Sequence, residues 1–306
     1  MWPTRMTTFN RLRDALVDYS ANQRDLPGVR DRAARETLSM QMVASLRRLD
    51  YTQIIRRRPI DPARAEPNSS IFDPERAAIL HARAGNIDEA FWLTFLMTHF
   101  GKHGRHGWRS LKDVYSGLGK LTWTWARVTA DPAEFRRWLQ RNGPRIGGAF
   151  ANHRKYETLR TDSGNGTASV VESYIDWIGP AHSHRERVAD LIREARNDPH
   201  VIFDHFYRSM QVKRLGRLGK FDFLTLLGRL ELVPMAPGST YLKGATAPLR
   251  GARLLFGGEV RANLDEARLE AWLRDLDLVL NVGMQVLEDS LCNWQKSPRQ
   301  FVHFRG

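Results

Sequence analysis

The residues best suited to chemistry surround a glycine-rich turn in the segment KRLGRLGKFD, residues 213–222. Gly216 and Gly219 would let the backbone turn tightly and bring N–H groups against a phosphate, and a following helix would add the positive end of its dipole. Arg214 and Arg217 are the predicted phosphate contacts. The pattern predicts a helical hairpin that grips DNA, and an ordinary helical corner with solvated basic side chains is the alternative.

The acid nearest this turn is Asp222, three residues after Gly219, with Lys220 beside it. A carboxylate there could stabilise positive charge on a sugar and activate water, with the lysine in electrostatic support. An aspartate near the start of a helix also commonly complements the helix dipole. Asp222 and Lys220 are therefore the first catalytic candidates. The alternative is that Asp222 has only the structural role of complementing the helix dipole.

Two other acidic pairs could replace Asp222. Glu288 and Asp289 lie on the last expected helix, in VLEDSLCNW, and would suit acid or base work if they faced a cleft. Glu172 and Asp176 are four residues apart, so they would share one face of a helix. Either pair would be unremarkable if it faced solvent.

Further polar segments are candidates for contacts with DNA. Lys102 and His103, in GKHGRHGWRS, and the run Asn152, His153, Arg154 and Lys155 offer phosphate contacts or an amide that reads a base edge. The glycines at 101 and 104 interrupt any helix that would align His99 with His103, so we predict no metal site.

A small-residue segment, YLKGATAPLRGARLLF, carries the candidates for a base pocket. Tyr241 beside Lys243 could stack on an extruded base, with Arg250 as a further DNA contact. The complete predicted base pocket comprises Tyr241, Asn152, His153 and Lys243.

The elements that would position these residues are helices. The run DEAFWLTFLMTHF, residues 88–100, is apolar nearly all round and predicts a core helix, and Asp131, Ser183 and Asp198 are expected N-caps. One helix is expected over 201–212 and the next from Lys220. Because no alternating strand pattern of useful length appears, the sequence predicts an all-α fold, and the loop DSGNGT, residues 162–167, could separate two lobes.

Composition limits the partners of this 306-residue chain. Lys and Arg number 47 against 34 Asp and Glu, a formal net charge of +13, which favours a nucleic acid as the partner. The partner that we expect is double-stranded DNA carrying modified bases. The single cysteine, Cys292, excludes an internal disulfide and a cysteine-based metal centre. No stretch is apolar enough to enter a membrane, so we expect a cytoplasmic protein. We also expect it to be a monomer and to use no cofactor.

Several segments together resemble one known family, the alpha-glutamyl/putrescinyl thymine pyrophosphorylases: FWLTFLMTHFGKHGRHGWRSLKDVYSGLG, FANHRKYETL, LGRLGKFDFLTLLGRL, PGSTYLKGATAPLRGARLLFGG and MQVLEDSLCNWQKSP. That family resembles the helix-hairpin-helix DNA glycosylases in fold and is associated with hypermodified phage DNA. The resemblance implies an N-terminal extension over 1–75 and a catalytic domain of two lobes over 76–306.

The resemblance leaves three functions to compare. The first expectation is a glycosylase that flips out a hypermodified base and cleaves its N-glycosidic bond, in defence against phages. The second is a transferase that joins an amine or amino acid to an activated thymine methyl group and displaces pyrophosphate. The third is a protein that binds modified DNA without catalysis.

Overall fold

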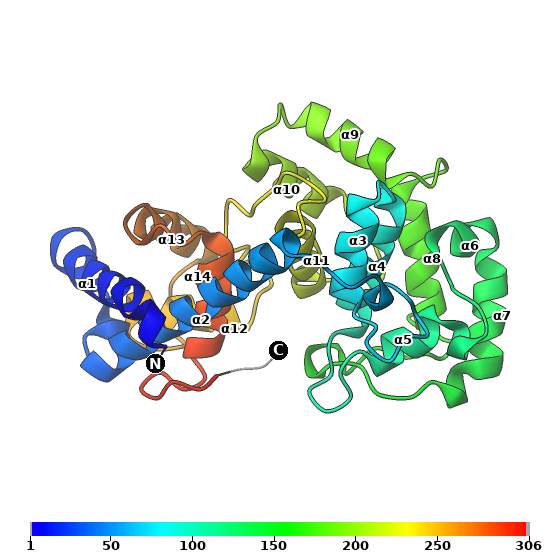
Figure 1. The fold of residues 1–306 in the computed structure, drawn as a ribbon. Helices are drawn as coiled ribbons and strands as arrows, with labels where there is room; N and C mark the ends of the chain where they lie inside the picture. The colour runs from blue at the N-terminus through cyan, green and yellow to red at the C-terminus, as the bar shows by residue number, and fades with distance from the viewer. Residues whose placement is uncertain (1, 304–306) are drawn as a thin grey trace. The chain divides into compact units, whose positions relative to one another are not determined.

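A computed structural model describes residues 2–303, and within that range the chain forms fourteen α-helices and six short 3-10 helices without a β-strand (Figure 1). The all-α prediction is confirmed. None of the described helices is both long and apolar enough to cross a membrane.

The described residues divide into two compact units, 2–52 with 236–303 and 53–235. The helices of the first unit are α1 (Met6–Asn22), most of α2 (Arg32–Arg57), α12 (Ala247–Gly257), α13 (Glu266–Leu280) and α14 (Met284–Trp294). Those of the second unit are α3 (Pro74–Arg83), α4 (Ile87–Phe100), α5 (Arg109–Tyr115), α6 (Trp125–Ala130), α7 (Pro132–Asn142), α8 (Thr167–Ile178), α9 (His184–Glu194), α10 (Pro199–Ser209) and α11 (Arg217–Arg229).

One hydrophobic core holds the first unit together. Leu12 and Leu16 of α1 are buried in the same cluster as Leu273 and Leu276 of α13. Helices α12 and α14 pack closely because Gly251 has no side chain, and a Cβ there would collide with the backbone carbonyl of Leu291. The first fifty residues therefore share a core with the C-terminal helices.

Helix α4 is the centre of the second unit, with α3, α9 and α11 packed around it (Figure 1). Every residue from Glu89 to Phe100 is buried, as the sequence predicted from the apolar run. Asn86 caps the helix by accepting a hydrogen bond from the backbone N–H of Glu89. Polar side chains lie at both ends of α4, so this buried helix positions two polar clusters, one at its start and one at its end.

The three predicted N-caps are confirmed. Asp131 Oδ1 accepts from the N–H of Glu134 at 2.8 Å, and Ser183 Oγ accepts from the N–H of Glu186 at 3.3 Å. Asp198 Oδ1 accepts from two N–H groups in the first turn of α10. Local hydrogen bonding of this kind depends only on neighbouring residues, which is why the sequence predicts it well.

The predicted hairpin loop was wrong in its boundaries. Helix α10 ends at Ser209 and α11 begins at Arg217, so Gly219 lies inside α11 and not in the loop. The residue that takes the left-handed conformation is Arg214, with φ 64°, whereas Gly216 is extended and serves as the N-cap of α11. The turn is thus made by a non-glycine residue, which is uncommon and requires support from its surroundings.

Candidate functional site

A polar cluster forms where the end of α4 meets the start of α11. Gly101 ends α4 with φ 64°, and a side chain there would collide with Ala151 and press on the ring of His153. The N–H of Ala151 donates to the carbonyl of Phe100 at 2.9 Å, which places the short 3-10 helix Asn152–Arg154 beside the end of α4. Helix α11 packs against α4 from another side.

Arg154 is the central cation of this cluster and is only 6% exposed. Its Nη2 donates to Oδ2 of Asp222 at 3.3 Å, whereas its Nε has no hydrogen-bond partner among the described residues. Gly219 makes room for the guanidinium, since a Cβ there would lie 2.9 Å from Nη1. The Nε atoms of Arg24, Arg35 and Arg187 also lack a hydrogen-bond partner among the described residues. It is therefore the position of Arg154 beside the first turn of α11 that favours an anion here.

Asp222 is the sixth residue of α11, beyond its first turn, so it does not simply complement the helix dipole. Its side chain keeps 38% of its surface exposed while it pairs with the buried Arg154. The carboxylate is therefore both oriented and open to solvent, as an acid–base group requires.

Lys220 and Arg214 extend the positive charge around the start of α11. Lys220 Nζ donates to the carbonyl of Tyr207 at 3.2 Å, and burial lowers the pKa of this lysine. Arg214 donates to a carboxylate oxygen of Glu157 at 3.3 Å and to the carbonyl of Tyr156 at 3.2 Å. These two contacts support the left-handed conformation of Arg214.

The start of α11 is itself suited to an anion. Gly216, the N-cap, has no side chain to cap the first turn, and that turn contains no acidic residue. Arg217 lies over the ring of Phe221, 4.9 Å from its centroid. The helix dipole and Arg154, which lies beside Gly219 in the first turn of α11, give this region a charge that fits a phosphate or a pyrophosphate, and Lys220 adds a further positive charge on the same helix.

His99, on α4, lies near Arg154 and Arg214 and is neutral. It is 2% exposed, and its Nε2 shares a hydrogen bond with Oγ1 of Thr167 at 2.9 Å. Burial, assisted by the charges of Arg154 and Arg214, lowers the pKa of His99 to about 3. The histidine thus adds no positive charge to the cluster near neutral pH.

The other residues predicted in this unit flank the cluster along the chain. Asn152, His153 and Lys155 are exposed on either side of Arg154, and Lys102 is exposed directly after Gly101. His103 instead turns its own loop, since its Nδ1 accepts from the N–H groups of Arg105 and His106. Within residues 2–303 no group of three or more His, Cys, Asp or Glu side chains could hold a metal ion.

The remaining predicted residues belong to the first unit. Glu288 is buried, and Asp289 forms an ion pair with Arg48 and accepts from Nδ2 of Asn293 at 2.9 Å. Lys243 and Arg250 are exposed. Asp289 is engaged by an ion pair within its own unit, and the functional roles of Glu288, Asp289, Lys243 and Arg250 stay predictions.

Tyr241 stands in a loop that a carboxylate holds in place. Its backbone is left-handed, with φ 51°, and its predicted role in a base pocket stays a prediction. Glu270 of α13 accepts from Ser239 Oγ, from the N–H and Oγ1 of Thr240, and from the N–H of Leu242. The sequence analysis missed Glu270, because nothing in the spacing of residues 239 and 270 indicates the contact.

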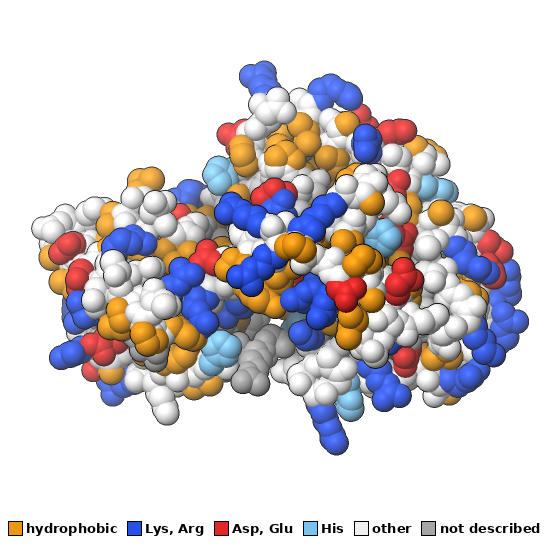
Figure 2. Space-filling model, viewed as in Figure 1, with side chains coloured by type: hydrophobic (Ala, Val, Ile, Leu, Met, Phe, Trp, Pro, Cys, Tyr) orange, Lys and Arg blue, Asp and Glu red, His pale blue; other side chains and the backbone are white. Residues whose placement is uncertain are grey.

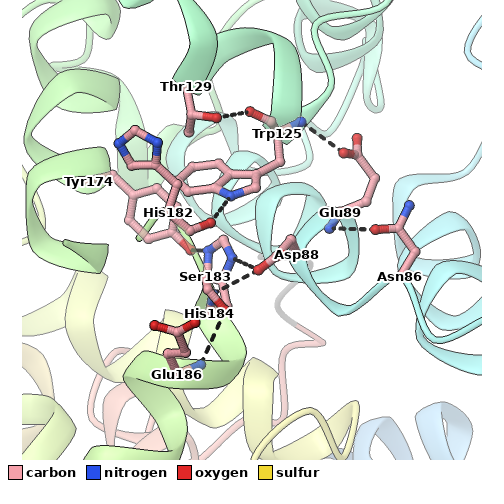
Figure 3. A network of polar contacts seen from close by, with 10 residues as sticks. All are labelled: Asn86, Asp88, Glu89, Trp125, Thr129, Tyr174, His182, Ser183, His184 and Glu186. Atoms are coloured by element: carbon pink, nitrogen blue, oxygen red, sulfur yellow. Dashed lines mark hydrogen bonds and ion pairs between the residues drawn. The ribbon is translucent and has the colours of Figure 1, made fainter. Parts of the chain in front are cut away.

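A second polar cluster, which the sequence analysis also missed, lies at the start of α4 (Figure 3). His184 is fully buried; its Nδ1 contacts Oδ1 of Asp88 at 2.8 Å and its Nε2 contacts the hydroxyl of Tyr174 at 2.8 Å. Asp88 Oδ1 also accepts from the N–H of His184 at 2.7 Å, and the ring of Trp125 lies 4.5 Å from the imidazole. The only signal in the sequence was the capping box, which places His184 first in α9.

The same network extends to the neighbouring acid. Glu89, which is buried, accepts from the hydroxyl of Tyr115 at 2.6 Å and from the N–H of Trp125 at 2.8 Å. Burial raises the pKa of Glu89, and these two hydrogen bonds oppose that shift. Because the polar groups here use one another as partners, the cluster is a clamp that joins α4, α6, α8 and α9.

The fold and the composition define a basic protein that is all-helical over its described residues, with Arg154 buried beside the start of α11. Residues 33–306 match the family described as alpha-glutamyl/putrescinyl thymine pyrophosphorylase clade 3, and the chain belongs to that family. No curated protein and no solved structure matches the chain. The family resemblance of the sequence analysis is confirmed.

The family match also changes the functional expectation. Its description names a pyrophosphorylase of modified thymine, so the chain belongs among enzymes concerned with modified DNA bases. N-glycosidic bond cleavage, the first expectation, is not supported, and neither is the expected likeness to helix-hairpin-helix glycosylases. The second expectation, pyrophosphate displacement at thymine, fits the family better.

Proposed function

We propose that this protein is a DNA-modifying transferase. Its substrate is a thymine whose methyl carbon, attached to ring carbon C5, carries a pyrophosphate ester. The enzyme joins an amine to that carbon and releases pyrophosphate. The amine nitrogen forms the new C–N bond with its lone pair. The C–O bond to pyrophosphate breaks, its electron pair leaves with the pyrophosphate, and the nitrogen gives up one proton to a base.

The observation that carries this proposal is the buried, incompletely used Arg154 at the start of α11. Pyrophosphate is a concentrated negative charge, and breaking the C–O bond adds more charge to it. Arg154, Lys220 and the dipole of α11 would stabilise that charge most strongly as the bond breaks, which lowers the barrier.

Asp222 is the proposed base. An incoming amine becomes positively charged as the C–N bond forms, and a nearby carboxylate both stabilises that charge and accepts the proton. The ion pair with Arg154 holds the carboxylate in one orientation beside the site for the leaving group. One arginine would thus organise the base and the pyrophosphate together.

The substrate is proposed to be modified DNA, in accordance with the charge of the chain. Figure 2 shows Lys and Arg side chains in many places on the visible face, with Asp and Glu side chains among them. Lys102, Lys155 and Arg217 are the proposed phosphate contacts nearest to the site. Such contacts fix the position of the strand without reading its sequence.

The test uses an oligonucleotide with one pyrophosphorylated 5-hydroxymethyluracil, together with putrescine or glutamate as the amine. We expect pyrophosphate release that depends on the amine, and a DNA product whose mass has lost pyrophosphate and gained the amine. Strand breaks after alkali, without an amine, would instead identify a glycosylase. Absence of amine-dependent pyrophosphate release with both amines would contradict the proposal.

A further inference from the structure

We infer that Tyr156 stacks on a base of the DNA that lies across the start of α11. The inference rests on the proposed function, in which DNA is the substrate. It names Tyr156 as a residue that contacts a base of that DNA rather than its phosphates. It is independent of the amine chemistry, because stacking requires only that DNA be bound at this site.

Tyr156 is unusually exposed for an aromatic residue. Its exposed fraction is 77%, and Tyr51, at 53%, is the only other aromatic residue among the exposed large hydrophobic residues of the described chain. Aromatic rings bury a large apolar area when they find a partner. A ring held in solvent beside cationic side chains offers a base both the apolar area and the charged surroundings that stacking uses.

The backbone that carries this ring is fixed. The carbonyl of Tyr156 accepts from Nη2 of Arg214 at 3.2 Å, and the N–H of Glu157 donates to the carbonyl of Arg154 at 2.9 Å. Arg214 also pairs with Glu157, whose side chain is only 6% exposed. The ring is thus presented from a tied loop, so that stacking would cost little ordering of the backbone.

The charges around the ring fit a nucleic-acid strand. The ammonium group of Lys155 lies 5.1 Å from the centroid of the Tyr156 ring, and Arg214 ties this loop to the one before α11. Cations that follow a backbone, combined with an aromatic face for a base, are the usual means of holding a single strand or an extruded nucleotide.

The experiment measures binding of a fluorescein-labelled oligonucleotide by anisotropy, for the wild-type protein and for Tyr156→Ala, Tyr156→Phe and Tyr51→Ala. Stacking on one base contributes about 1–3 kcal/mol, so Tyr156→Ala should weaken binding by about 5-fold to 150-fold. Tyr156→Phe keeps the ring and should bind as the wild type does. Tyr51→Ala removes an exposed tyrosine elsewhere and should also leave affinity unchanged.

Two further readouts separate stacking from charge. An oligonucleotide with 2-aminopurine should lose fluorescence on binding to the wild type and keep it with Tyr156→Ala. The slope of log affinity against log salt should stay the same in Tyr156→Ala and become about 1 unit shallower in Lys155→Ala. Unchanged affinity and unchanged quenching in Tyr156→Ala, in a protein that melts like the wild type, would overturn the inference.

The outcomes also separate this inference from the proposed reaction. Tyr156-dependent binding without pyrophosphate release would support stacking and contradict the transferase. Pyrophosphate release together with full affinity in Tyr156→Ala would do the reverse. A wild-type protein without affinity for DNA would contradict both.

Discussion

Helix α4 has a polar cluster at each end, and the two clusters differ in how fully their hydrogen-bonding groups are used. At the start of the helix, His184 uses both ring nitrogens, one on Asp88 and one on Tyr174. At its end, Arg154 makes one ion pair with Asp222 and leaves its Nε unused. His184 thus has no ring nitrogen left without a partner, whereas Arg154 keeps an unused donor.

The difference indicates which buried polar groups stabilise the fold and which prepare a function. A buried group that is fully paired contributes to rigidity, because loss of one partner leaves the others unsatisfied. A buried cation with an unused donor beside a helix N-terminus gains a partner only when an anion arrives. Both clusters use the same rigid helix, so changes at one end should leave the other end intact.

The largest effect is expected from Asp222→Asn at the cluster around Arg154. The amide keeps the shape of the side chain but accepts no proton, so the rate of pyrophosphate release should fall by about 100-fold to 10,000-fold. Affinity for DNA should change little, since the cations stay in place. Asp190→Asn, an exposed change on α9, is the matched control, and an unchanged rate in Asp222→Asn would remove this residue from the mechanism.

The next effect is on stability and comes from the cluster around His184. His184→Ala leaves the buried hydroxyl of Tyr174 without its partner and opens a cavity, at a cost of about 3 kcal/mol in the free energy of unfolding. Denaturant unfolding measures this loss, and Tyr174→Phe should cost less, about 1 kcal/mol. Calorimetric affinity of the folded protein for pyrophosphate should stay at the wild-type value; a large change would show that the two ends of α4 are coupled.

The sequence predicted those parts of the fold that depend on neighbouring residues. The apolar run of α4 and the caps Asp131, Ser183 and Asp198 are local patterns, and the structure confirms them. Periodicity shows which face of a helix is buried but not which helix covers it. It therefore did not reveal that α1 and α2 share a core with α12 to α14.

The candidate site was predicted in its residue types but not in its contacts. Asp222, Lys220 and Arg154 were all selected, yet the pairing of Arg154 with Asp222 joins residues 68 positions apart and could not be read from spacing. Gly219 was assigned to a loop because glycine usually marks a turn, whereas its function here is to leave space for the guanidinium. Tyr156 was overlooked because exposure is a property of the folded chain.

Arg154→Met should produce a smaller effect, on anion binding. Methionine keeps much of the length of the side chain without its charge, so affinity for pyrophosphate should fall by about 10-fold to 30-fold in calorimetry. Arg193→Met, which removes an exposed arginine of α9, is the control and should bind pyrophosphate as the wild type does. If both variants bound pyrophosphate equally well, the cluster around Arg154 would not be the anion site.

The smallest effect is the contribution of His99 to the dependence of stability on pH. Its pKa is about 3 in the folded protein and about 6.5 in the unfolded chain, so the unfolded chain binds more protons below pH 6.5. The free energy of unfolding is therefore greatest above pH 6.5 and falls with decreasing pH, with a contribution from His99 of about 1.4 kcal/mol at pH 5.5. The lowered pKa of His184 acts in the same direction.

His99→Gln isolates this contribution, because glutamine can keep the hydrogen bond to Thr167 without titrating. Denaturant unfolding of both proteins at pH 7.5 and pH 5.5 gives the loss of stability for each, and the variant should lose about 1.4 kcal/mol less than the wild type. Equal losses would mean that His99 is solvated or already charged. In that case His99 would not be the neutral, buried neighbour of Arg154 and Arg214, and the difference between the two ends of α4 would rest on Arg154 and His184 alone.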